Sequence, residues 1–170
     1  MLDRSEAKSG ALRLFTKAGI VLTEVEIANL EVADFGLGQL EKYGLQLVVY
    51  VNNDHYCAKE MVLLPRQTCL QHRHPAIGRP MGKIETFRCR WGEVYLYVPG
   101  ENKGAVKAVV EDERRSGFTV WKEVVLRPGE QYTIPPNTWH WFQAGEKGAV
   151  ISEFSTHSND ATDEYLDKEV

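Results

Sequence analysis

The sequence predicts a mainly β fold, a barrel or sandwich, with a short helical segment at its N-terminus. From Gly44 to about residue 157, short runs of β-forming residues alternate with turns rich in glycine and proline. No helical pattern lies between these runs, which disfavours a parallel α/β sheet. With 170 residues, the chain can bury a sizeable core within one domain.

The first 43 residues are expected to form a helical extension packed on the barrel. Asp3 or Ser5 can cap a first helix, which is expected to end at Gly19. A second short helix is predicted over residues 24–35, where apolar side chains recur up to a glycine.

The barrel is expected to occupy residues 44–157, and it begins with the β-forming run Leu45–Val51. Each later strand is a short apolar run bounded by turn residues. These strands are predicted over residues 60–64, 68–74, 84–89, 93–98, 105–110, 119–126, 131–134, 139–144 and 148–155. Residues 158–170 are acidic and are expected to form a short helix or a disordered end of the same domain.

The composition disfavours several classes of function. A net charge of −4 without a basic block argues against a nucleic-acid partner. No apolar run reaches the roughly 18 residues of a membrane span, and the charged N-terminus lacks the apolar core of a signal peptide. Cys57, Cys69 and Cys89 form no CxxC pair, and their odd number fits a reducing compartment. We therefore expect a cytoplasmic protein without a membrane or nucleic-acid partner.

Three histidines occur in patterns that suit a metal ion. His72 and His74 are two positions apart in a predicted strand, so their imidazoles point to the same side. His140 follows the turn at residues 135–137 and opens another predicted strand. Pairs of the first kind also occur on protein surfaces, and a single histidine among aromatic residues is more often part of a core. Each pattern alone therefore leaves the question of a metal site open.

A carboxylate and a lysine share one face of a predicted strand. Alternation places four side chains on that face: Lys83, Glu85, Phe87 and Cys89. If Phe87 and Cys89 face the barrel interior, so does Glu85, and a buried carboxylate requires a counter-charge or a metal. The alternative is an ion pair between Lys83 and Glu85 on the protein surface.

These residues resemble the two sequence motifs of the cupin family. The first motif is HxH followed by Glu and Gly, and the second is Gly, five residues, then Pro-x-Gly-x-x-His. The matching positions are His72, His74, Glu85 and Gly92, and then Gly129, Pro135 and His140. Arg66 and Asn137 stand where the family usually has glycine. An insert at Pro75–Ile84 lengthens the first motif and is expected to form a loop at the barrel mouth.

Membership of the cupin family implies a jelly-roll β-barrel that holds one divalent metal ion. The implied ligands are His72, His74, Glu85 and His140. Three imidazoles and one carboxylate suit Mn²⁺, Fe²⁺, Co²⁺, Ni²⁺ or Zn²⁺, and manganese is the ion that we expect.

Within the cupins, the chain resembles the D-lyxose isomerase family. The resemblance rests on the helical N-terminal segment, Lys83-Ile84-Glu85, the Arg90-Trp91-Gly92 turn, Glu153, and the element Asn159-Asp160-Ala161-Thr162-Asp163. It implies a metal-dependent aldose–ketose isomerase that moves a proton between C1 and C2 through an enediol. The expected pairs are D-lyxose with D-xylulose and D-mannose with D-fructose.

The same resemblance implies roles for the remaining residues. Glu153 is expected to be the general base, and Lys83 is expected to donate a hydrogen bond to a developing alkoxide. Asp163 and Asp160 are expected to bind sugar hydroxyls. The alternatives are a surface position for Glu153 on an edge strand and a solvated tail for the two aspartates.

Aromatic residues are expected to form an apolar wall for the sugar. Phe87, Trp139 and Trp141 are the candidates, although a tryptophan pair is more often plain core. The apolar runs Leu45–Val51 and Val120–Leu126 suit covered strand edges, so we expect a homodimer.

Two other classes of function remain open. The ligand set of three histidines and one glutamate also suits an iron-dependent cupin dioxygenase. The chain could equally be a sugar-binding cupin without catalytic activity.

Overall fold

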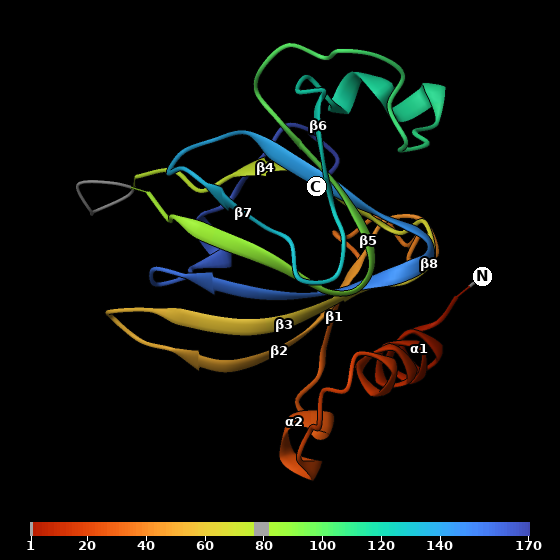
Figure 1. Cartoon of the computed structure of the whole chain (residues 1–170), viewed down its shortest axis with the longest axis vertical. Helices are drawn as coiled ribbons and strands as arrows, with labels where there is room; N and C mark the ends of the chain where they lie inside the picture. The colour runs from red at the N-terminus through yellow and green to blue at the C-terminus, as the bar shows by residue number, and fades with distance from the viewer. Residues whose placement is uncertain (1, 77–81) are drawn as a thin grey trace.

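The computed structural model describes residues 2–76 and 82–170, and their strands form one strongly curled sheet (Figure 1). Two α-helices, α1 (Arg4–Lys17) and α2 (Glu24–Ala28), lie on one side of it. The strands are β1 (Glu31–Ala33), β2 (Leu45–Asn52), β3 (Cys57–Leu63), β4 (Thr68–Arg73), β5 (Glu85–Val98), β6 (Lys122–Leu126), β7 (Gln131–Ile134), β8 (His140–Ser155) and β9 (Glu164–Tyr165). The predicted fold class, a mainly β barrel of the cupin type with a short helical N-terminal segment, is confirmed.

The two longest strands, β5 and β8, form the centre of the barrel. They pair antiparallel along most of their length, from Glu85 opposite Ser155 to Tyr97 opposite Trp141. The C-terminal half of β8 also pairs with β3, and its N-terminal half pairs with β4. β8 therefore joins both sides of the curled sheet, and β3, β4 and β5 all surround one interior.

Close packing of β5 against β8 requires glycine at position 92. Gly92 has a φ of +75°, and a Cβ atom there would lie 2.0 Å from the carbonyl oxygen of Gly148. The pairing of the two strands is interrupted at this point. The glycine that ends the first cupin motif is thus needed for the approach of the two central strands.

Helix α1 covers the outer face of the sheet. It begins at a capping box in which Asp3 and Glu6 accept hydrogen bonds from each other's backbone N–H groups, as predicted for Asp3. The chain turns away from the helix at Gly19, which has a φ of +71°. The buried side chains of the helix and the sheet side chains in the same cluster are Ala7, Ala11, Leu14 and Phe15 with Val48, Val62 and Val150.

The helix predicted over residues 24–35 is wrong in its second half. Helix α2 ends at Ala28, and β1 pairs antiparallel with β2 from residue 31 to residue 33. Val32 is buried in this pairing. Burial against a neighbouring strand has thus overridden a helical pattern of about three turns.

The strand predicted over residues 105–110 is also wrong. Among the described residues no strand pairs with this segment, and side chains accept hydrogen bonds from its backbone instead. The N–H groups of Lys107, Ala108 and Val109 donate to the side-chain oxygens of Glu123, Tyr97 and Gln143. An apolar segment that pairs with no strand can therefore satisfy its backbone N–H groups through side chains, as a loop.

Four of the predicted strands are halves of two longer ones. Residues 84–89 and 93–98 belong to β5, and residues 139–144 and 148–155 belong to β8. The Arg90-Trp91-Gly92 turn expected from the sequence is instead an irregularity within the continuous strand β5.

The tail folds onto the barrel. It contains a short 3₁₀ helix, η2 (Asp160–Thr162), followed by β9, which pairs with the end of β4. Of the insert at Pro75–Ile84, residues 77–81 lie outside the described residues. Within the described residues, no helix is long and apolar enough to cross a membrane.

Candidate active site and metal centre

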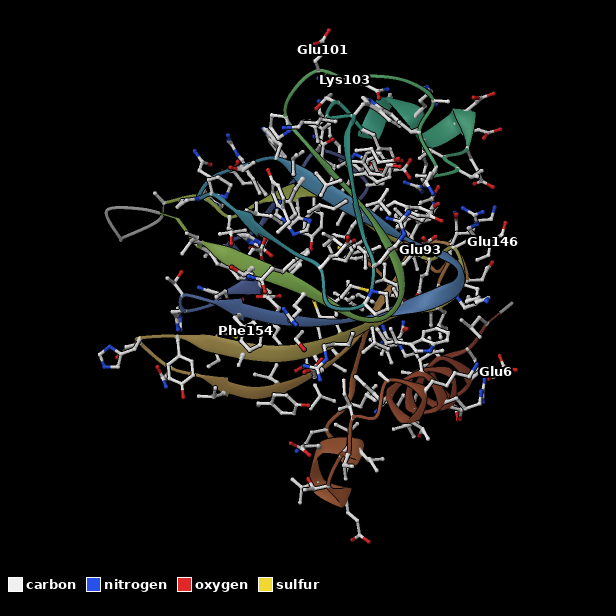
Figure 2. The ribbon with its side chains drawn as sticks, viewed as in Figure 1. Glu6, Glu93, Glu101, Lys103, Glu146 and Phe154 are labelled. Carbon is white, nitrogen blue, oxygen red and sulfur yellow. The ribbon has the colours of Figure 1, made fainter. Side chains whose placement is uncertain are left out.

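A cavity of about 230 Å³ lies inside the barrel. Its lining comes from strands β2, β3, β4, β5 and β8, from residues 32–35, and from the tail. Strand alternation decides which side chains reach it: Glu153 points inward and is 2% exposed, whereas Phe154 lies on the outer face of β8 and is 52% exposed (Figure 2). A larger surface hollow, of about 890 Å³, is lined by charged residues such as the ion-paired Arg114 and Asp167 and by no histidine among the described residues.

Three histidines and one glutamate converge at one end of this cavity. Ligand atoms of His72, His74 and His140 all lie within 4.8 Å of one another. Glu85 Oε1 lies 3.2 Å from His74 Nε2 and 2.9 Å from His140 Nε2. All four side chains are buried. The two motifs therefore meet as the sequence predicted, and the surface alternative for Glu85 is excluded.

Hydrogen bonds fix the orientation of each imidazole. The Nδ1–H of His72 donates to Leu70 O over 2.8 Å, and that of His140 donates to Thr138 O over 2.9 Å. His74 Nδ1 lies 2.6 Å from Asp163 Oδ1. Since a carbonyl or carboxylate oxygen can only accept, the proton of each neutral ring is on Nδ1 and the lone pair is on Nε2.

The converging atoms fit a bound metal ion. Three buried atoms, Nε2 of His74, Nε2 of His140 and Oε1 of Glu85, have no partner with hydrogen-bond geometry among the described residues. Buried polar atoms without partners are rare, and a missing ion is one explanation for them. Three nitrogen donors and one carboxylate oxygen suit a first-row divalent ion, and partners on the far side of each imidazole are typical of metal sites.

Charge balance in the cavity agrees with a divalent cation. Arg4 and Asp34 form an ion pair at its rim. The remaining charged groups in the described lining are four carboxylates and two ammonium groups, from Glu85, Glu153, Asp160, Asp163, Lys59 and Lys83. With neutral imidazoles this leaves two negative charges, which one divalent ion would neutralise.

Without an ion, electrostatics favour the cation-binding protonation states of Glu85 and His72, whereas His74 keeps a proton at neutral pH that a bound cation would displace. Burial and the neighbouring His140 and His74 hold the pKa of His72 well below its usual 6.5. For His74, burial is outweighed by Glu85 and Asp163, which raise its pKa to about 9. Burial would also raise the pKa of Glu85, but Lys83 outweighs it and holds that pKa well below 4.5. Glu85 is thus ionised and His72 is neutral, as ligation requires.

Lys83 joins the metal centre to Glu153. Its Nζ lies 2.8 Å from Glu85 Oε2 and 2.6 Å from Glu153 Oε1. Burial lowers the pKa of Lys83, but the two carboxylates outweigh burial and raise it above 10.5. Ser155 Oγ donates to the same oxygen, Glu153 Oε1, over 3.0 Å. Among the described contacts of Glu153, none uses Oε2, so this oxygen is available for a substrate proton.

Lys59 is a cavity residue that the sequence did not single out. It is 5% exposed, and its Nζ lies 3.1 Å from Ser158 Oγ, 3.5 Å from Asp160 Oδ1 and 4.0 Å from Glu153 Oε1. Strand alternation could have identified it, because Lys59 and Met61 lie two residues apart in one strand and Met61 faces the core. Lysine side chains are almost always exposed, so the residue type alone does not indicate an interior position.

The tail residues have different surroundings from those expected. Asp163 was expected to bind sugar hydroxyls, but its Oδ1 lies against His74 and orients that ring. Asp160 lies at the cavity with a side chain that is 61% exposed. Both aspartates therefore lie at the cavity, Asp163 against a histidine and Asp160 largely exposed to solvent.

The aromatic residues separate into two groups. Phe87 lines the cavity with Phe142, and Tyr165 from the tail adds a ring 5.5 Å from that of His72. Trp139 is not among the described lining residues, and the Arg73 guanidinium lies 4.7 Å from its ring centre. Trp141 is buried in a separate cluster behind the barrel wall. Position 140 points inward, so both neighbouring tryptophans point elsewhere.

A family model and individual relatives both match this chain, and they agree on the family. The model of the D-lyxose isomerase family matches residues 22–170. A D-lyxose ketol-isomerase of Thermofilum sp. (strain ex4484_79) is 58% identical over 165 residues, which cover 97% of this chain and 92% of the relative. A D-lyxose/D-mannose isomerase of Thermosediminibacter oceani is 54% identical over 173 residues, which cover 100% of this chain and 96% of the relative.

Solved structures resemble the fold. The L-ribose isomerase of Acinetobacter sp. DL28 in complex with L-ribose superposes with a TM-score of 0.77 at 15% identity, covering 97% of this chain and 91% of the other. The ligand-free L-ribose isomerase of Cellulomonas parahominis gives the same values. At this identity the likeness concerns the fold alone.

Proposed function

The chain belongs to the D-lyxose isomerase family and is a sugar isomerase, and from this premise we propose that it interconverts D-lyxose and D-xylulose, and also D-mannose and D-fructose. We further propose that the reaction depends on a divalent metal, manganese being the expected ion. The observation that carries this proposal is the continuous line from the histidine cluster through Glu85 and Lys83 to Glu153.

The proposed ligands are His72, His74, Glu85 and His140. A divalent ion held there would supply Lewis-acid stabilisation of negative charge on the sugar oxygens. Every other part of the reaction falls to side chains of this chain.

Glu153 is proposed to carry the proton between the two carbons. Its carboxylate takes the proton from C2 of the aldose, which leaves an enediolate, and returns it to C1 of this intermediate, which gives the ketose. The hydroxyl proton on O2 moves to O1 in the same overall step, so atoms and charge balance. Lys83 holds the Oε1 atom of Glu153 through a 2.6 Å contact and thereby aims the free Oε2.

Lys83 also supports the charge that develops on oxygen. Its ammonium group has three N–H donors, and two of them are engaged by Glu85 and Glu153. The third can donate to the oxygen that becomes anionic during proton transfer.

The size and charge of the cavity support an uncharged monosaccharide. A volume of about 230 Å³ is below the usual 300–1,000 Å³ of ligand pockets and suits a small substrate. With a divalent ion in place, the described charged groups leave no surplus cation for a phosphate. Phe87 and Phe142 offer an apolar surface to the C–H groups of a sugar.

A panel of aldopentoses and aldohexoses tests the proposal. The protein is stripped with a chelator, reloaded with Mn²⁺, Fe²⁺, Co²⁺, Ni²⁺ or Zn²⁺ in turn, and assayed for ketose formation. We expect turnover of D-lyxose and D-mannose, highest with Mn²⁺, and loss of turnover and of bound metal in His72→Ala. Metal-dependent oxygen uptake without ketose formation would indicate a dioxygenase instead. Sugar binding without turnover under every metal would indicate a binding protein.

A cytoplasmic homodimer is proposed as the working form. The three cysteines are free thiols, which suits a reducing compartment. On the outer face of the sheet, Tyr50 and Phe154 are half-exposed on strands β2 and β8. Covering them in a second copy would remove apolar surface from water. A dimer mass by light scattering is expected, and a monomer mass at micromolar concentration would contradict it.

A further inference from the structure

Lys59 is a buried ammonium group that the proposed proton transfer does not use. It lines the cavity at 5% exposure and is held by Ser158 and Asp160 from the tail. A buried lysine is unfavourable unless its N–H groups are engaged. Its described contacts at hydrogen-bond distance are limited to Ser158, because Asp160 is at 3.5 Å and Glu153 at 4.0 Å. At least one N–H donor is therefore available to a ligand.

Strand register places Lys59 on the far side of Glu153 from the metal centre. Lys59 on β3 pairs with Glu153 on β8, and Glu153 pairs with Phe87 on β5. Neighbouring strands are about 4.8 Å apart, so the backbone of Lys59 lies about 10 Å from that of β5, which carries Glu85. If C1 and C2 of a sugar lie beside Glu153 and Glu85, its remaining carbons must lie in another part of the cavity.

The Lys59 anchorage is built from several elements of the fold. Ser158, which accepts from Lys59, is itself joined to Asn52 at the end of β2. Asn52 Nδ2 donates to Ser158 O over 2.8 Å, and Ser158 N donates to Asn52 Oδ1 over 3.1 Å. Ser158 Oγ also lies 2.9 Å from Asp160 Oδ1. The tail is thus fixed at the point where Lys59 and Asp160 meet the cavity.

We propose that Lys59 and Asp160 form a subsite for the terminal hydroxyl of the sugar, at the end of the chain away from the reacting carbons. This inference rests on the proposed function and adds the substrate length that the site recognises. An ammonium group donates and a carboxylate accepts, so the pair matches a hydroxyl, which does both. The subsite distinguishes a five-carbon sugar from a four-carbon one by the presence of that hydroxyl.

Alditols test the subsite without turnover, because they lack the carbonyl group. D-arabinitol is the alditol of D-lyxose, and erythritol is the same molecule without its terminal CH₂OH group. Binding of both to the metal-loaded protein is measured by calorimetry for wild type, Lys59→Met and Asp160→Asn. Lys122→Met is the matched control, because Lys122 is an exposed lysine on β6 outside the cavity.

The wild type and Lys122→Met are expected to bind D-arabinitol more tightly than erythritol. In Lys59→Met, D-arabinitol binding is expected to weaken roughly 10- to 100-fold, the size of one hydrogen bond to a charged group, with erythritol binding unchanged. Asp160→Asn, whose side chain is 61% exposed and whose fold is not at risk, is expected to show the same selectivity with a smaller loss.

Two outcomes would overturn the subsite. One is equal binding of the two alditols by the wild type, and the other is an equal loss for both in Lys59→Met, which would mean that Lys59 only positions Glu153. Isomerase assays on D-lyxose and L-erythrose separate this inference from the proposed function. Tighter binding of D-arabinitol than of erythritol without any isomerisation would contradict the proposed function alone. Isomerisation with equal binding of the two alditols would contradict the subsite alone.

Discussion

At the scale of single residues, the site depends on what surrounds each carboxylate. Glu85 lies among imidazole nitrogens and Lys83, so it is held ionised as a ligand. Glu153 contacts Lys83 and Ser155 through Oε1 but none of the three histidines among its described contacts, so it is not part of the histidine cluster. Two glutamates in one small cavity therefore have separate roles, because their neighbours differ.

Glu153→Gln tests the role of this carboxylate in the reaction. The amide keeps the shape of the side chain and cannot take a proton from carbon. We expect kcat to fall by about 10²–10⁴-fold with KM changed much less, since the metal ligands are untouched. Glu146→Gln alters an exposed glutamate at the bend in the middle of β8, away from the cavity (Figure 2), and this control is expected to leave kcat unchanged. Near-wild-type turnover in Glu153→Gln would remove Glu153 from the mechanism.

Glu60 provides a test of electrostatics away from the site. It is nearly buried on β3, where Ser152 Oγ lies within hydrogen-bond distance of both of its oxygens. Burial raises the pKa of Glu60 above 4.5, although Ser152 and Arg90 oppose this. The folded protein therefore keeps this proton to a higher pH than the unfolded chain does. Stability must fall as pH rises between those two pKa values.

Glu60→Gln removes this pH dependence while keeping a hydrogen-bond partner for Ser152. We expect the variant to be more stable than wild type at pH 7, by no more than about 1 kcal/mol. The difference should shrink as pH falls toward 4.5, where the wild-type carboxyl regains its proton. Urea unfolding at pH 7 and pH 5 measures it, and a difference that grows on acidification would contradict the expected sign.

At the scale of elements, the tail is part of the site. β9 pairs with β4, so the chain segment that carries Asp163 lies next to the strand that carries His72 and leads into His74. The acidic tail thereby provides the hydrogen-bond partner of one proposed metal ligand, His74. Such partners typically change metal affinity when they are lost.

Asp163→Ala is therefore expected to weaken metal binding by about 10- to 100-fold, because His74 loses the group that orients its ring. Chelator competition measures the affinity. Asp167→Asn is the control in the same tail, since it alters the contact with Arg114 but does not touch His74. Unchanged metal affinity in Asp163→Ala would show that β4 alone holds His74 in place.

The elements also show how far sequence reasoning reaches. Motif spacing together with the cupin resemblance predicted that His72, His74, Glu85 and His140 meet in one interior, because strand alternation determines which side chains share a face. The strand predicted over 105–110 failed because Glu123, Tyr97 and Gln143, distant in sequence, accept hydrogen bonds from that backbone. Lys59 was missed for a similar reason: its partners Ser158 and Asp160 lie about a hundred residues away. Local sequence patterns predict which side chains share one face of a strand. The contacts of those side chains depend on residues from other elements.

At the scale of the whole molecule, the barrel gathers buried polar and charged side chains around one small cavity. Helix α1 stabilises the outer face of the sheet, while the segment at residues 32–35 and the tail close over the interior. Lys83 and Glu153 are 6% and 3% exposed, and burial strengthens the electrostatic contact between them. The fold thus brings together the buried groups to which we assign the proton transfer.

Solvent labelling is the measurement that tests proton transfer by this site most directly. The metal-loaded protein converts D-lyxose in D₂O, and the ketose is returned to H₂O and analysed by mass spectrometry and NMR. Because a carboxylate exchanges its proton with solvent, we expect D-xylulose with carbon-bound deuterium at C1 in at least part of the product. D-xylulose without any carbon-bound deuterium, or no D-xylulose at all, would contradict proton transfer through Glu153.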